Sequence, residues 1–111
     1  MYVGRDFYPM STAESDVIGL DFINDLNPEE HILVTNWFIT VVAGVDVAAQ
    51  KCLQGPSFSY TTDDNAYPTA VIQRVGDLQP GVTYAMRAEV ETDFGNFKDL
   101  WSHIRGEAIS P

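Results

Sequence analysis

The most informative run for the fold is Leu78-Gln79-Pro80-Gly81-Val82-Thr83-Tyr84. Pro-Gly is turn chemistry, because proline presets the backbone for a turn and glycine accepts a positive φ. The run therefore predicts a chain reversal.

The residues that follow alternate cleanly between apolar and polar. Thr83 to Thr92 places apolar side chains on one face and Arg and Glu on the other, as expected of an antiparallel strand with one solvated face. Asp93 to Asn96 has the composition of a hairpin turn. Leu100 to Ile109 then alternates again, so we predict a last strand there.

Upstream, strands are predicted at Asp16–Phe22, at His31–Val42 and, starting at a proline, at Pro68–Val75. Phe58–Thr62 is a further short strand. The segment from Val45 to Leu53 fits either a strand or a helical turn.

The alternation of side chains between the two faces of His31–Val42 leads to one more prediction. Trp37, Ile39 and Val41 share a face, whereas Ile32 has the opposite parity. A bulge between Ile32 and Trp37 would let both reach the core.

Polar turns are predicted in the loop Asn24–Glu30, at Gln54–Ser57 and at Thr62–Asn65. Six or seven short strands separated by such turns indicate an all-β sandwich. At 111 residues the chain has room for one domain. We assign residues 15–111 to the sandwich and residues 1–14, the N-terminal segment, to an extended arm. This segment either packs on its own sandwich as an edge strand or reaches a neighbouring subunit.

The Leu78–Tyr84 run resembles the corner before the penultimate strand of immunoglobulin and fibronectin-III domains, and Trp37 stands where such sandwiches place a central aromatic residue. The resemblance implies an immunoglobulin/fibronectin-III-like antiparallel β-sandwich. Leu78, Trp37 and Tyr84 are then its structural core. The resemblance implies that Leu78 plugs the end of the sandwich and that Tyr84 buries its ring while its hydroxyl bonds the backbone a few residues upstream.

Most of the chain also resembles the small immunoglobulin-like structural proteins of tailed bacteriophages, of the decoration or fibre-to-tail adaptor type. The matching stretches are Glu14–Phe22, Ile32–Val42, Tyr84–Gly95 and Leu100–Ile109, although Asp21-Phe22 stands where that group often has Asp-Trp. The resemblance implies a virion structural protein that is made in the host bacterial cytoplasm. It would self-associate as a homo-oligomer and contact capsid, portal, tail or fibre proteins.

The net charge of −10 narrows the choice of partners. Nucleic acid and anionic membranes would repel this surface, so we expect neither to bind. Basic protein surfaces are favoured. The single cysteine, Cys52, excludes an internal disulfide and favours folding in a reducing cytoplasm. No signal peptide and no spanning segment of about 20 apolar residues is evident.

No catalytic grouping stands out. The two histidines, His31 and His103, lack neighbours at metal-ligand spacing, and Cys52 lacks an activating partner. Asp63-Asp64-Asn65 resembles part of a calcium loop but lacks its spacing and terminal Glu, so we interpret it as a turn. We therefore expect no enzyme activity, metal or cofactor.

Apolar residues in the N-terminal segment and acidic residues on an exposed strand face are the candidates for partner binding through the arm and sheet edges. They are Tyr2, Phe7, Tyr8, Met10, Glu89 and Glu91. A partner, or a cross-strand base such as Arg105, would relieve repulsion between the two glutamates. The alternative function is a fibronectin-III-type accessory binding module for carbohydrate, which would use exposed aromatic residues.

Overall fold

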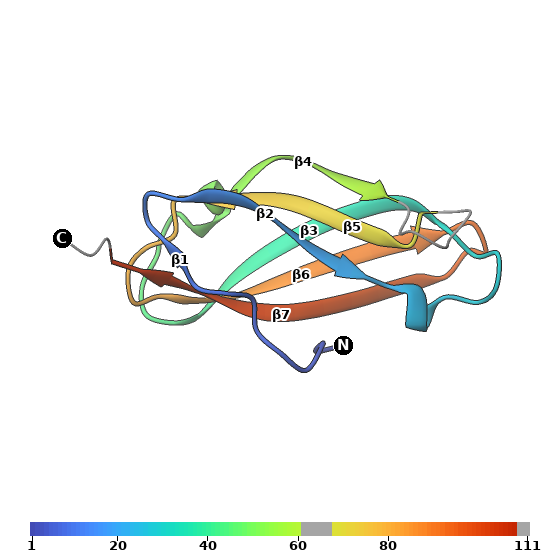
Figure 1. Cartoon of the computed structure of the whole chain (residues 1–111), viewed down its shortest axis with the longest axis horizontal. Helices are drawn as coiled ribbons and strands as arrows, with labels where there is room; N and C mark the ends of the chain where they lie inside the picture. Colours follow the sequence, from blue (N-terminus) through green and yellow to red (C-terminus); the bar gives the residue numbers. More distant parts are fainter. Residues whose placement is uncertain (61–67, 109–111) are drawn as a thin grey trace.

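The computed structural model describes residues 1–60 and 68–108, and they form two packed β-sheets (Figure 1). The strands are β1 (Met10–Ser11), β2 (Ser15–Asp21), β3 (Ile32–Ala43), β4 (Leu53–Tyr60), β5 (Ala70–Gly76), β6 (Thr83–Thr92) and β7 (Phe97–Glu107). Two short 3-10 turns, η1 (Ile23–Asp25) and η2 (Ala49–Cys52), complete the elements. The predicted all-β, two-layered architecture is confirmed.

One sheet has the strand order β1-β7-β6-β3 and the other the order β2-β5-β4. All neighbouring strands are antiparallel except β1 and β7, which run parallel. Figure 1 shows the three-stranded sheet lying over the four-stranded one, in a molecule about twice as long as it is wide, with extents of 48 × 25 × 23 Å. The edge strands are therefore β1 and β2 on one side, and β3 and β4 on the other.

The core lies between the sheets and is filled by alternate residues of the strands. Side chains from β3 and β6 meet those of β2 and β5, and Trp37, Leu78 and Tyr84 are all buried there. Alternation along β6 is complete, since every second residue from Tyr84 to Thr92 is buried. The period-2 pattern in the sequence marks that face because successive strand residues point to opposite sides.

The Leu78–Tyr84 run forms the predicted chain reversal. Gly81 has φ of +77°, and the Tyr84 hydroxyl accepts a hydrogen bond from the backbone N–H of Gln79 at 2.9 Å. Gly106 of β7 lies so close that an added Cβ would stand 2.1 Å from the Gln79 carbonyl oxygen. The reversal is thereby packed directly against the last strand.

The predicted irregularity in the third strand is present. The register between β3 and β6 shifts between Ile32 and Val34, and both Ile32 and Trp37 are buried. The undecided segment Val45–Leu53 contains the 3-10 turn η2, and its last residue begins β4.

The turn predicted at Gln54–Ser57 is wrong, because these residues belong to β4. Gly55 has φ of +78°, and the pairing with β5 shifts register between Gln54 and Phe58. Gly and Pro therefore mark a strand irregularity here instead of a chain reversal. The turn predicted at Thr62–Asn65 lies outside the described residues.

The last hairpin forms where predicted, with Thr92 N–H bonded to the Asn96 carbonyl at 2.9 Å and Gly95 at φ of +79°. The last strand begins three residues earlier than predicted, at Phe97, and ends at Glu107. Ile109, the predicted end, lies outside the described residues.

A buried carboxylate holds the hairpin to the chain before β3. Glu30 is only 2% exposed, and its oxygens accept hydrogen bonds from the backbone and side chain of Asn27, from the Thr92 hydroxyl and from the Asn96 amide. The Thr92 bond first, followed by the Asn27 backbone bond, lowers the pKa of Glu30 to about 2. A buried charge with this many donors is well compensated. Within residues 1–60 and 68–108, no helix is long and apolar enough to cross a membrane.

Candidate functional site: an open strand edge

The N-terminal segment lies along β7 of its own sheet. Trp101 N–H donates to the Met1 carbonyl at 2.9 Å, and the N–H groups of Val3 and Phe7 donate to the carbonyls of Trp101 and His103. The Ser102 hydroxyl donates to the Arg5 carbonyl. This is the first of the two arrangements expected from the sequence; contact of the segment with a neighbouring subunit stays a prediction.

The candidate partner-binding residues of this segment differ widely in exposure. Met10 is a core residue at 5% exposure, and Phe7 is half-buried against the core. Tyr8 is 93% exposed, and Tyr2 is exposed beside Trp101. In this arrangement only the two tyrosines offer a ring to a partner, while Met10 stabilises the fold.

The neighbouring strand, β2, has a free backbone edge. Phe22 N–H donates to the Thr69 carbonyl at 2.8 Å, and the register of β2 with β5 is unbroken. Since hydrogen bonding alternates along an antiparallel pair, the even-numbered residues of β2 face β5. The backbone groups of Val17, Gly19 and Asp21 therefore face away from the sheet.

Little covers this edge among the described residues. No hydrogen bond joins residues 1–10 to β2, and the outward N–H of Val17 is bonded only by the side chain of Asp16, at 2.7 Å. An unpaired strand edge is a template for pairing with another chain unless it is blocked. We call the backbone of Val17 to Asp21 the open edge of β2. This edge is available for pairing with a strand of another chain.

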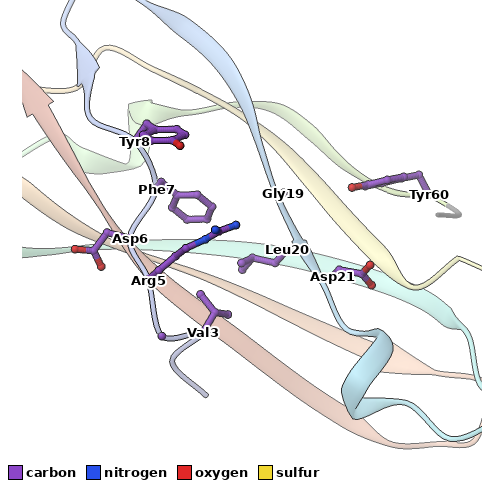
Figure 2. Close-up of a pocket in the computed structure, with 10 residues that line it drawn as sticks. Val3, Arg5, Asp6, Phe7, Tyr8, Gly19, Leu20, Asp21 and Tyr60 are labelled. Carbon is purple, nitrogen blue, oxygen red and sulfur yellow. The ribbon is translucent and has the colours of Figure 1, made fainter. Parts of the chain in front are cut away.

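A groove runs between this edge and the N-terminal segment (Figure 2). It consists of a hollow of about 920 Å³ and an adjoining one of about 310 Å³, which share Phe7, Tyr8 and Gly19. Figure 2 shows Phe7 and Arg5 pointing from the segment toward β2, whereas Asp6 points away from it. We call these two hollows together, bounded by residues 3–10 and 14–21, the edge groove.

The opposite side of the sandwich, formed by the edges of β3 and β4, is more nearly closed. Ser57 Oγ donates to the Thr35 carbonyl at 3.1 Å, and Gln50 Nε2 donates to the Ile39 carbonyl at 3.4 Å. These bonds tie the edge of β3 to β4 and to η2. The two sides thus differ, and the β2 side is the one with room for an additional strand.

Glu89 and Glu91 lie on the outer face of the four-stranded sheet, where both are half-exposed. Glu89 accepts a hydrogen bond from Arg87 at 3.0 Å. The expectation that Arg105 would neutralise these residues is wrong, because Arg105 lies opposite Thr83, near the other end of β6.

The same face carries a small aromatic cluster. The rings of Tyr2, Trp101 and His103 have centroids 4.9 to 5.8 Å apart. Arg87, which pairs with Trp101 in the sheet register, lies 4.5 Å from the ring centroid of Phe38. Of the two tryptophans only Trp101 is accessible, since Trp37 is buried.

The cysteine and the two histidines, which were considered as chemical groups, have other environments. Cys52 is buried, and its desolvation, with the nearby charge of Asp46, raises the pKa of the thiol to about 11. Such a thiol is protonated at neutral pH and is a poor nucleophile. His31 lies 3.1 Å from Asp93, and His103 lies 3.6 Å from Asp6. In the described part of the chain, no three His, Cys, Asp or Glu side chains gather as metal ligands would.

The open edge of β2 was not identified from the sequence, which located only the strand. Its signal is the stretch Asp16-Val17-Ile18-Gly19, in which a glycine interrupts an alternating strand. Glycine in a strand often marks a place where another backbone approaches closely. Which edge is free depends on the sheet order, and that follows only from the fold.

No family model, no curated protein and no solved structure matches this chain.

Proposed function

We propose that the chain is an immunoglobulin/fibronectin-III-like assembly domain that binds by accepting a strand at the open edge of β2. Two features support the immunoglobulin-like assignment. Strands β2, β5 and β4 form one sheet and β3, β6 and β7 lie together in the other, as the corresponding strands do in immunoglobulin constant domains, although β1 joins β7 here rather than the sheet of β2. A buried tyrosine, Tyr84, makes the corner hydrogen bond to the backbone of Gln79.

The open edge beside the edge groove is the observation that carries the binding role. A strand added there would gain several main-chain hydrogen bonds at once, and pockets for alternate side chains would give specificity. The backbone of Gly19 lies at the centre of this edge and has no side chain to obstruct an incoming chain. Binding of this kind needs no catalytic group, in keeping with a domain that acts without chemistry.

The setting that we propose is the virion of a tailed phage, where the domain would serve in an adaptor, head-tail or decoration role. The support for this setting is the resemblance of the sequence to small immunoglobulin-like phage proteins. The domain would be made in the host bacterial cytoplasm and would work by contacts with other virion proteins and with copies of itself. Strand addition suits such assembly because it joins subunits without a large preformed pocket.

Replacing Val17 with proline tests this role. Val17→Pro removes an outward N–H but no bond of the β2–β5 ladder, and proline is tolerated on edge strands for that reason. Val17→Thr, which keeps the N–H, is the matched control. Circular dichroism and a thermal melt first establish that both variants are folded.

The readout is the amount of each variant in purified particles made from the genome that encodes it, measured by quantitative mass spectrometry. We expect the threonine variant at the wild-type level and the proline variant reduced at least tenfold. Equal incorporation of the two variants contradicts strand addition at β2. Absence of the wild-type chain from purified particles contradicts the virion setting.

A second candidate function is carbohydrate binding on the outer face of the four-stranded sheet. The cluster of Tyr2, Trp101 and His103, with the carboxylate of Asp6 hydrogen-bonded to the Tyr2 hydroxyl at 2.8 Å, favours it. Aromatic rings with a polar rim are a common platform for ligands that are apolar on one side and polar at the edge.

A further inference from the structure

We infer that the strand accepted by the open edge of β2 is an extended segment of another protein that carries Lys or Arg side chains. The inference rests on the proposed strand addition and specifies the chemistry of the partner. It follows from the charges along the edge groove, from the placement of Gly19 and from the apolar groups on the groove floor.

Acidic side chains outnumber basic ones along the groove. Among the described residues, its lining includes the carboxylates of Glu14, Asp16 and Asp21 on the β2 side, and Arg5 is the one cation. Asp6 belongs to the lining but points away, toward Tyr2 and His103. The groove is therefore acidic, within a chain of net charge −10.

Local hydrogen bonds orient the three carboxylates on the β2 side of the edge groove. Each accepts a nearby backbone N–H: Glu14 that of Ser11, Asp16 that of Val17, and Asp21 that of Ile23. All three residues are exposed, and within residues 1–60 and 68–108 no salt bridge joins any of them to a cation. An incoming Lys or Arg would supply the missing counter-charge.

A second copy of β2 is a poorer occupant of the same edge. Antiparallel pairing of two β2 strands around Gly19 would place Asp21 of each copy opposite Val17 of the other. Asp16 of each copy would then lie near Asp21 of the other at each end of the paired segment, so four carboxylates would be brought to one interface. Charged residues on an edge strand protect it from self-pairing. Charge therefore selects a different, basic strand.

The groove floor indicates the pattern of that strand. Ile18 and Leu20 are buried beneath the edge, and Phe7 borders it from the other side. Because strand side chains alternate, every second residue of the incoming segment would face this apolar floor. The intervening side chains would lie on the outer side, beside Asp21 and Tyr60, whose hydroxyl stands 3.7 Å from the position a Cβ on Gly19 would take. The segment is thus expected to alternate apolar and basic residues.

Two synthetic peptides test this chemistry. One is a nine-residue peptide that alternates valine with lysine, and the other has glutamate in place of every lysine. Binding to the whole chain is measured by isothermal titration at low and at high ionic strength. The variant Asp16→Asn/Asp21→Asn removes two exposed charges and no core side chain, and Lys51→Gln, which removes a charge outside the groove lining, is the control.

We expect the lysine peptide to bind at least tenfold more tightly than the glutamate peptide at low salt. That preference should shrink at high salt, since exposed charges are screened. The double Asp variant should lose most of it, and Lys51→Gln should keep it. Equal binding of both peptides, or of neither, overturns the inference of a basic strand. The proposed function is decided separately by the incorporation of Val17→Pro, which does not depend on the partner's charge.

Discussion

The Tyr84 hydroxyl donates a hydrogen bond of 2.7 Å to Oδ2 of Asp46. Tyr84 lies on β6, while Asp46 lies in the loop after β3, so this bond joins two segments 38 residues apart. The same hydroxyl accepts the Gln79 N–H, which makes it the junction of the chain reversal and the loop. The bond from Tyr84 is also the main cause that lowers the pKa of Asp46.

Removing this hydroxyl should weaken the whole domain. Tyr84→Phe keeps the buried ring but leaves the Gln79 N–H without its acceptor and removes one of the donors to Asp46, which keeps the Ala48 N–H. We expect the free energy of unfolding to fall by about 1–3 kcal/mol, the usual cost of an unsatisfied buried polar group. Urea denaturation measures it. Tyr8→Phe, at a 93% exposed site, is the control and should change nothing measurable.

Glu30 makes the stability of the domain dependent on pH. Its pKa is about 2 in the folded chain, below the ordinary value of 4.5, so the folded state favours the ionised form. A lowered folded pKa gives stability that is fully present above the unfolded pKa and is lost as the pH falls through the folded one. We therefore expect Glu30 to cause a loss of stability between about pH 4.5 and pH 2.

Glu30→Gln tests this contribution. All four hydrogen bonds at Glu30 come from donors, and the glutamine NH₂ would face two of them. At pH 7 the variant should be about 1–3 kcal/mol less stable, as expected when a buried partner is lost. The stability difference from wild type should narrow as the pH falls from 4.5 to 2. A constant difference across this range would rule out the assigned role, and exposed Glu29→Gln is the control.

The N-terminal segment should contribute to stability through Met10. Because the side chain is 5% exposed and belongs to the core, Met10→Ala should cost about 2–5 kcal/mol, as large-to-small core substitutions do. Thermal unfolding followed by circular dichroism measures the change. Val47→Ala, at a 97% exposed position, should leave the melting temperature unaltered. Deletion of residues 1–14 is consequently an unsuitable test of partner binding, since it removes part of the core.

Carbohydrate binding, the second candidate function, has a simple optical test. A glycan on the outer face should change the fluorescence of Trp101 but not that of buried Trp37. Tyr2→Ala should reduce the affinity of any glycan found on an array, because Tyr2 packs against Trp101. Glycan binding that is unchanged in Tyr2→Ala would place the sugar elsewhere.

Periodicity accounts for what the sequence could predict. The alternation from Thr83 to Thr92 gave a strand and its buried face correctly, because side-chain direction follows directly from strand geometry. The parity conflict between Ile32 and Trp37 located a bulge for the same reason. At Gln54–Ser57 the local composition gave a wrong prediction of a turn, because Gly and Pro occur at strand irregularities as well as in turns.

The candidate site could not be located in the same way. An open edge depends on the order of strands in the sheet, and that order is set by contacts between residues distant in the sequence. The burial of Met10 depends on distant contacts in the same way. Pro9 before it is exposed and Ser11 after it is half-buried, and the parallel pairing of β1 with β7 places Met10 in the core.

Amide hydrogen exchange at Gly19 tests the central claim most directly. In the free chain we predict that the Gly19 N–H exchanges freely, while those of Ile18 and Leu20 are protected by the β5 ladder. Saturation with the alternating valine–lysine peptide should slow exchange at Gly19 at least tenfold. A Gly19 amide already protected in the free chain, or one unchanged in the saturated complex, would contradict strand addition at β2.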